Sequence, residues 1–142
     1  MNRENFNVKK VIIVGGGMAG LTSATYLSSV FNGQDITVIE KLSRVGKKIL
    51  STGNGQCNLT NENITLSNYH GLDNNFSKYA IELYGKDSLI DFFERLGVKL
   101  FNDNGKFYPL SKQATSVLDA LRFYLDYKNV EVKTEETVLD LS

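Results

Sequence analysis

The feature that most constrains this chain is a glycine-rich turn between a short apolar run and a helical pattern. Val11–Val14 is continuously apolar and β-branched, as in a strand that is buried on both faces. From Met18 to about Ser29, apolar and small residues recur at helical spacing. Gly15, Gly17 and Gly20 spell GxGxxG across this junction. A strand that leads through such a turn into a helix predicts the first half of a dinucleotide-binding βαβ unit.

Each part of the turn has a physical role in that interpretation. Gly15 permits the tight turn, Gly17 lets the backbone approach a pyrophosphate, and Gly20 lets the helix pack closely on the strand. Met18 and Ala19 open the helix, where unpaired amide hydrogens attract an anion. These five residues form the first part of the predicted cofactor site.

A second apolar run, Ile36–Ile39, predicts a strand parallel to the first, so the chain begins β, α, β. Glu40 ends this strand, twenty residues beyond Gly20, and Lys41 follows it. A carboxylate at this place accepts hydrogen bonds from adenosine ribose hydroxyls and repels a 2′-phosphate. We therefore expect FAD or NAD rather than NADP, with Glu40 and Lys41 in the cofactor site.

The remainder predicts an α/β protein of about one domain, because no linker or repeat interrupts the 142 residues. Residues 42–72 are rich in Gly, Asn, Ser and Thr and predict a long irregular loop of functional importance. Gly33 is expected to end the first helix, and Ser111 to cap the last one. Further helices are expected at 76–84 and 88–96, a hairpin at 98–108 around Asn104-Gly105, and strands at 130–134 and 137–141.

Composition excludes several classes of protein. Lys plus Arg (16) equals Asp plus Glu (16), which leaves no basic excess to attract nucleic acid or an anionic membrane. No apolar run approaches the length of a membrane span. The single cysteine, Cys57, closes no intrachain disulfide, CxxC pair or Cys-rich zinc site, so we expect no metal and a cytoplasmic location. Cys57 is expected to be a small buried hydrophobe and His70, the only histidine, a surface loop residue.

The glycine motif does not separate FAD from NAD, but the segment after Glu40 does. Residues 46–61, GKKILSTGNGQCNLTN, closely resemble a signature of the BaiN-like predicted flavoprotein family, which includes aminoacetone oxidase family FAD-binding enzymes. The resemblance extends to residues 11–40, 105–111 with Ala114, and 130–141, and therefore to nearly the whole chain. One departure is Gln56, where the family usually has Arg, so a fixed cation is lost beside the diphosphate or an acidic substrate.

The resemblance implies further cofactor contacts. It selects the backbone of Val138 as an adenine contact, and it assigns to the FAD site the glycines, a lysine and an amide of the signature: Gly46, Lys48, Gly53, Gly55 and Asn58. It also implies an FAD-dependent oxidoreductase with a Rossmann-like FAD domain, a small-molecule substrate and NAD(P)H as a candidate electron donor. Catalytic residues and oligomeric state are not assigned.

Family members run well over twice this length, so the resemblance makes residues 1–142 the N-terminal portion of an FAD-binding domain. Residues 42–72 would be its FAD-contacting loop, and the substrate domain would be absent. The chain by itself is then expected to be inactive. Two alternatives stay open: a truncated relative without activity, and a Rossmann module that binds NAD.

Overall fold

The computed structural model describes residues 10–71, 73 and 75–140, and it divides into two compact units. The first unit comprises the described residues up to Lys48 together with those from Leu121 onward, and the second comprises Ile49–Ala120. The second boundary falls inside one continuous helix, where no change in composition marks it. Each unit is described by itself.

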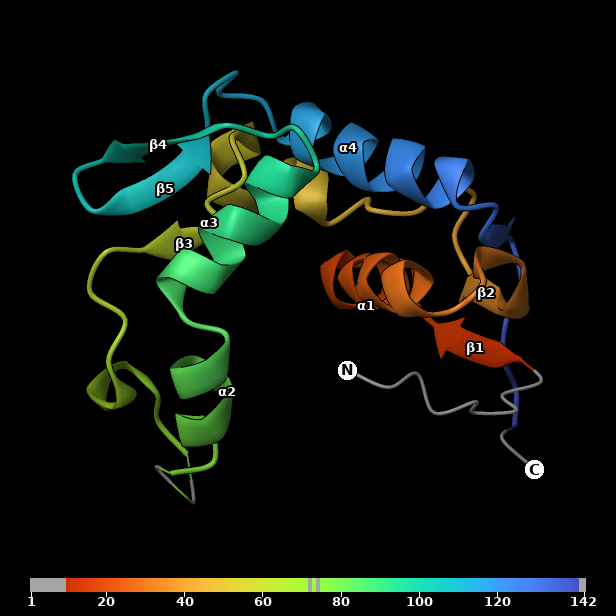
Figure 1. Ribbon diagram of the computed structural model, residues 1–142, viewed down its shortest axis with the longest axis horizontal. Helices are drawn as coiled ribbons and strands as arrows, with labels where there is room; N and C mark the ends of the chain where they lie inside the picture. The colour runs from red at the N-terminus through yellow and green to blue at the C-terminus, as the bar shows by residue number, and fades with distance from the viewer. Residues whose placement is uncertain (1–9, 72, 74, 141–142) are drawn as a thin grey trace. The chain divides into compact units, whose positions relative to one another are not determined.

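The first unit is a three-stranded parallel sheet with a helix on it. Strands β1 (Val11–Val14), β2 (Ile36–Glu40) and β6 (Glu131–Thr134) lie in the order β1-β2-β6 (Figure 1). Val11 pairs with Ile36 in a parallel register, and Thr37 pairs with Glu131. Helix α1 (Met18–Val30) connects β1 to β2 and contacts both strands. The predicted parallel, Rossmann-like βαβ unit is confirmed.

Only one face of this sheet is buried. Ile36 and Val38 are fully buried with Leu21 of α1, whereas Ile12 and Val14, which point to the other face, are 63% and 57% exposed. The alternation follows from the strand period of two. Among the described strands β1 lies at the edge, so an apolar face and a sheet edge lie together at this side of the first unit.

The second unit is built on an antiparallel sheet with strand order β3-β5-β4. Asn104 and Gly105, with φ values of 50° and 85°, connect β4 to β5 as predicted, since a type I′ turn needs positive φ at both positions. Figure 1 shows the hairpin beside α3, which contacts β3 and β4. The elements are η2 (Ile49–Gly55), β3 (Thr60–Asn61), η3 (Leu66–Asn68), α2 (Lys78–Leu83), α3 (Lys86–Arg95), β4 (Leu100–Asp103), β5 (Lys106–Pro109) and the first half of α4 (Ala114–Tyr127).

Several predicted details are wrong. Gly33 does not end α1, which stops at Val30; instead it begins the 3₁₀ turn η1 (Gly33–Asp35), where a Cβ would lie 1.8 Å from the Lys128 carbonyl oxygen. Ser111 precedes α4 by three residues, and its Oγ accepts a hydrogen bond from the Gln113 amide within the turn rather than at the cap.

The expected strand over 137–141 is also wrong for residues 137–140, which are irregular, and Leu141 lies outside the described residues. Among the described residues, no strand pairs with residues 137–140. Residues 42–72 are largely irregular as predicted, but Thr60 and Asn61 form the two-residue strand β3 by pairing with β5; Leu72 lies outside the described residues. Among the described residues, no helix is long and apolar enough to cross a bilayer.

Leu21 tests the packing of α1 on the sheet. Leu21→Ala should lower the free energy of unfolding by about 2–5 kcal/mol, because a fully buried side chain leaves a cavity. Val30→Ala, at a position 59% exposed on the same helix, should stay within about 0.5 kcal/mol. Urea unfolding followed by circular dichroism measures both, and equal losses for the two variants would contradict this packing.

Candidate functional site

The glycine turn follows β1 directly, and its geometry explains the glycines. Gly15 has φ +100° and donates its amide hydrogen to the Ile39 carbonyl oxygen over 2.8 Å. A Cβ on Gly20 would lie 1.9 Å from the Gly15 carbonyl oxygen, so only glycine lets α1 start this close to the turn. A Cβ on Gly17 would meet nothing within 4 Å. Packing therefore requires glycine at position 20, whereas the space beside Gly17 is open.

The first turn of α1 is suited to an anion. Gly17 is the N-cap residue in extended conformation, and no side chain caps the helix. The first turn carries no acidic residue. Met18 and Ala19 begin the helix, so their amides lie among those without an intrahelical acceptor. Unpaired amides and the helix dipole together favour a phosphate group here.

The carboxylate of Glu40 joins the end of β2 to the glycine turn. Its Oε2 accepts a hydrogen bond from the Gly16 amide over 2.8 Å, and its Oε1 accepts one from the Leu42 amide over 2.9 Å. The hydrogen bond from Leu42 is the largest cause that lowers the pKa of Glu40; burial opposes it, and the Gly16 amide and Lys41 assist. Each oxygen keeps a second lone pair, so the carboxylate can still accept hydrogen bonds from a ribose.

Gly16 is the residue that sequence reasoning missed. Besides donating to Glu40, it accepts a hydrogen bond at its carbonyl oxygen from the Gly46 amide over 2.7 Å. A Cβ on Gly16 would lie 2.4 Å from Cγ1 of Val45, which is buried. The loop after β2 thus folds back onto the glycine turn. The signal was a run of three consecutive glycines, in which Gly16 stands at the position that the motif leaves free.

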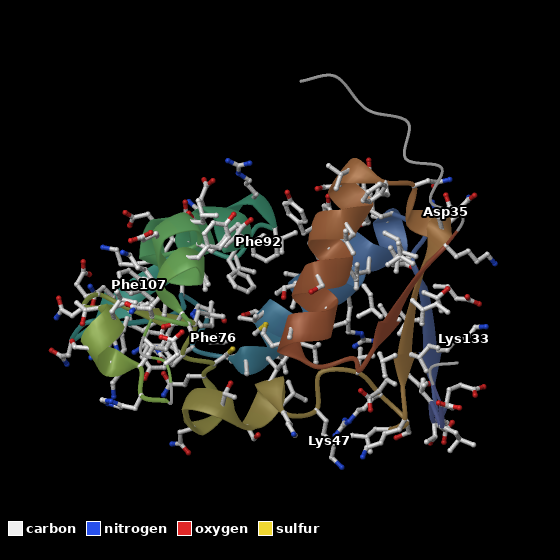
Figure 2. The ribbon with its side chains drawn as sticks, turned by 90° about the horizontal axis from the view of Figure 1, so that it is seen from below. Asp35, Lys47, Phe76, Phe92, Phe107 and Lys133 are labelled. Carbon is white, nitrogen blue, oxygen red and sulfur yellow. The ribbon has the colours of Figure 1, made fainter. Side chains whose placement is uncertain are left out.

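Of the predicted site residues, the structure brings together the glycines of the turn, Glu40 and Gly46. Lys41 and Lys48 are exposed in the loop that follows β2. Figure 2 shows Lys47 of this loop beyond one end of the sheet and Asp35 at the other, where β2 begins. Val138 is half-buried in the irregular segment after β6, whose Glu136 amide donates to the Glu40 carbonyl oxygen over 3.1 Å.

Gly53, Gly55 and Asn58 belong to the second unit, where both glycines have positive φ and the Asn58 side chain is hydrogen-bonded. Gly53 has φ +54°, and a Cβ there would lie 2.6 Å from the Asn58 backbone nitrogen. Gly55 has φ +81°. The Asn58 amide nitrogen Nδ2 donates to the Thr60 carbonyl oxygen over 3.0 Å and to that of Phe107 over 3.2 Å. The side chain of Asn58 thereby holds β3 against β5 and keeps its own amide oxygen available.

Cys57 and His70 lie as expected. Cys57 is 1% exposed, and burial raises the pKa of its thiol, an effect that a hydrogen bond with the Thr52 side chain partly opposes. His70 is an exposed loop residue. In the described part of the chain, no group of three or more His, Cys, Asp or Glu side chains is placed to hold a metal ion.

The parallel βαβ unit, the glycine turn and the carboxylate that closes on it define a dinucleotide-binding segment of the Rossmann type. The chain belongs to the HI0933-like family: the family model for the HI0933-like protein Rossmann domain matches residues 9–142. This match confirms the family that the sequence resemblance to the BaiN-like flavoproteins indicated.

Comparison with individual proteins agrees with this family. The chain is 36% identical over 127 residues to a 3-dehydro-bile acid delta(4,6)-reductase of Clostridium scindens, covering 89% of this chain and 31% of that protein. It is 33% identical over 102 residues to a ribosomal RNA dihydrouridine synthase of Haemophilus influenzae, covering 66% of this chain and 25% of that protein. The chain thus spans less than a third of the length of either relative.

The fold is similar to that of a solved structure, THI4 of Thermovibrio ammonificans, with a TM-score of 0.55 over 89% of this chain and 38% of the other. Sequence identity to THI4 is 14%, so this likeness concerns the fold alone.

The hydrogen bonds of Glu40 make stability depend on pH. Because its pKa in the folded chain lies below the ordinary value of 4.5, the carboxylate stabilises the fold above pH 4.5 and loses this contribution as the pH falls through the lowered pKa. Glu40→Gln should therefore lower the free energy of unfolding by about 1 kcal/mol at pH 7, because the two hydrogen bonds are partly exposed, and by less at lower pH. Urea unfolding between pH 3 and pH 7 measures the difference, with the exposed Glu136→Gln as a control that should change little. A cost that grows toward low pH would contradict this sign.

The thiol of Cys57 should resist modification in the folded chain. Since the thiolate is the reactive form and burial disfavours it, a disulfide-exchange reagent at pH 8 should label Cys57 only on addition of denaturant. The matched control is Ser23→Cys in a Cys57→Ala background, because Ser23 is exposed on α1. Labelling of native Cys57 as fast as that of the control would show that the thiol is accessible.

Proposed function

We propose that this chain is the FAD-binding segment of a flavin-dependent oxidoreductase. The observation that carries the proposal is the Glu40 carboxylate, held by the Gly16 amide beside an open glycine turn at the start of α1. The resemblance of residues 46–61 to FAD-binding flavoproteins favours FAD over NAD, since both share the ADP moiety that the turn would hold.

The residues present fit an ADP moiety. The space beside Gly17, in which a Cβ would meet no atom, admits a diphosphate close to the backbone. The uncapped amides at Met18 and Ala19 would donate to its oxygens. Glu40 would accept hydrogen bonds from the adenosine ribose and disfavour a 2′-phosphate. When bound, FAD supplies the hydride and electron transfer that amino-acid side chains do not perform.

The other residues assigned by resemblance complete this proposal. In the loop after β2, Lys41, Gly46 and Lys48 would contact the cofactor. The backbone of Val138 would contact adenine. By the same resemblance, Gly53, Gly55 and Asn58 would contact the cofactor. Gln56 is half-buried where the family usually has Arg, so less positive charge would be available to an anionic group.

We propose the reaction for the whole protein, since the chain spans only 31% and 25% of the lengths of the two relatives. The names of the two relatives, a reductase and a dihydrouridine synthase, both denote the addition of hydrogen to a substrate. The name of the first relative denotes a bile acid and that of the second ribosomal RNA. Following the first, we propose reduction of a small-molecule substrate, with NAD(P)H as the electron donor. The chain by itself would bind the ADP moiety without catalysing the reaction, because it corresponds to less than a third of either relative.

Gly17→Ala tests the proposed diphosphate contact. Gly17 has φ −80°, and the added methyl group meets no atom, so the free energy of unfolding should stay within about 0.5 kcal/mol. The same methyl group would lie where a diphosphate approaches, so ADP binding by calorimetry should weaken about tenfold or more, equivalent to about 1.4 kcal/mol. Gly71→Ala, another glycine whose Cβ would be unobstructed, is the matched control and should bind ADP normally.

Parallel titrations with FAD, NAD and NADP separate the flavin from the nicotinamide alternative. The proposal expects FAD to bind most tightly and NADP most weakly. Normal ADP binding by Gly17→Ala would remove the glycine turn from the site, whereas NAD binding tighter than FAD would favour a nicotinamide-binding module instead.

A further inference from the structure

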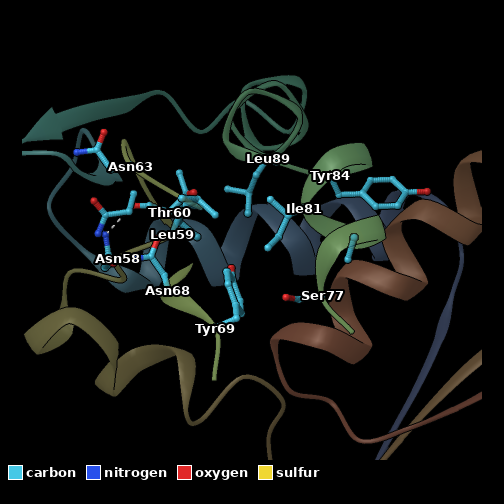
Figure 3. Close-up of a pocket in the computed structure, with 14 residues that line it drawn as sticks. Asn58, Leu59, Thr60, Asn63, Asn68, Tyr69, Ser77, Ile81, Tyr84 and Leu89 are labelled. Carbon is cyan, nitrogen blue, oxygen red and sulfur yellow. Dashed lines mark hydrogen bonds between the residues drawn. The ribbon is translucent and has the colours of Figure 1, made fainter. Parts of the chain in front are cut away.

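A cavity of about 790 Å³ lies within the second unit, between two segments distant in sequence (Figure 3). One wall is formed by residues 58–61, 63, 64, 68 and 69, and the other by residues 77, 80, 81, 84, 85 and 89, in and around α2 and the start of α3. Cavities of this size accommodate drug-sized molecules. None of the residues that line it carries a formal charge.

Two hydroxyl groups in this cavity have no hydrogen-bond partner among the described residues. They are Oγ1 of Thr60 and Oγ of Ser77, which are both buried from solvent, and both residues line the cavity. Figure 3 shows the Ser77 oxygen pointing toward the space beside Tyr69. Buried polar groups in folded proteins are nearly always satisfied, so two such hydroxyls in one cavity indicate a missing partner.

The backbone holds Thr60 in this position. Thr60 is 7% exposed and pairs with Phe107 in the sheet, and its carbonyl oxygen accepts a hydrogen bond from Asn58 Nδ2. The β3–β5 pairing therefore fixes the backbone of Thr60 at the wall of the cavity. A hydroxyl both donates and accepts, so a carbonyl or a hydroxyl oxygen on a ligand would satisfy it.

The other lining groups define the rest of the ligand. Leu59, Ile64, Ile81 and Leu89 supply aliphatic surface, and Tyr69 supplies an aromatic ring. Because no cation lines the cavity, a phosphate or carboxylate would lose its hydration without gaining a counter-charge. The lining thus favours an uncharged molecule with an apolar body and one or two oxygen atoms.

We propose that this cavity is a binding site for a small, uncharged and largely apolar molecule that bears a hydroxyl or carbonyl oxygen, with the hydroxyls of Thr60 and Ser77 as its hydrogen-bond partners. The site goes beyond the proposed dinucleotide function. It uses residues of the second unit only, whereas the glycine turn and Glu40 belong to the first; Asn58 is the one lining residue that is also a proposed FAD contact.

The test measures binding of 2-naphthol to the 142-residue chain by calorimetry, with naphthalene and 2-naphthalenesulfonate for comparison. We expect saturable binding of 2-naphthol, weaker binding of naphthalene, and at least tenfold weaker binding of the charged sulfonate. Thr60→Val, which replaces the hydroxyl by a methyl group of similar size, should weaken 2-naphthol binding about fivefold. Thr60→Ser, which keeps the hydroxyl, should restore it.

The matched control is Thr115→Val, because Thr115 is exposed on α4 and does not line the cavity. If Thr60→Val fails to fold, Ser77→Ala tests the second hydroxyl contact with 2-naphthol, because Ser77 lies outside the sheet. All these variants should bind ADP as the unaltered chain does, which separates failure here from failure of the dinucleotide proposal.

Three results would overturn the proposal. The first is absence of saturable 2-naphthol binding, and the second is sulfonate binding as tight as that of 2-naphthol. The third is displacement of 2-naphthol by riboflavin at equal concentration, which would assign the cavity to the ring system of a flavin rather than to a separate ligand.

Discussion

The hydrogen bond between the Glu40 carboxylate and the Gly16 amide is the interaction on which the candidate site depends. It joins the turn after β1 to the end of β2, and the Leu42 amide holds the second carboxylate oxygen. Because the acid is anchored to the backbone on two sides, its position beside the turn does not depend on a cofactor. A preorganised acceptor of this kind loses little conformational entropy when a ribose binds.

The packing around the turn explains why glycines gather there. The absence of a side chain at Gly20 lets α1 pack against the Gly15 carbonyl oxygen. The absence of one at Gly16 leaves room for Val45, in the loop whose Gly46 amide donates to Gly16. Gly17 differs because nothing occupies the place of its missing side chain. Two of these glycines therefore serve the fold, whereas the third leaves space that a ligand would use.

In the second unit, a polar side chain stabilises the fold. Asn58 uses both hydrogens of its amide to hold β3 against β5, and this pairing carries Thr60 to the wall of the cavity. The segment that resembles a flavoprotein signature therefore has a structural role of its own. Its residues contribute to the sheet and to the uncharged lining of the cavity, in addition to any contact with a cofactor.

The sequence by itself determined the βαβ unit, the glycine turn and the acid at the end of β2, because these depend on local periodicity and on motif spacing. It also determined the Asn104-Gly105 hairpin, since positive φ at both turn residues is a local requirement. Only the tertiary structure decided that Gly16 joins Glu40 to Gly46, that Thr60 forms a strand, and that residues 137–140 do not. The two contacts of Gly16 and the pairing of Thr60 depend on partners that are distant in sequence. The hydroxyls of Thr60 and Ser77 are likewise brought to one cavity only by the tertiary structure.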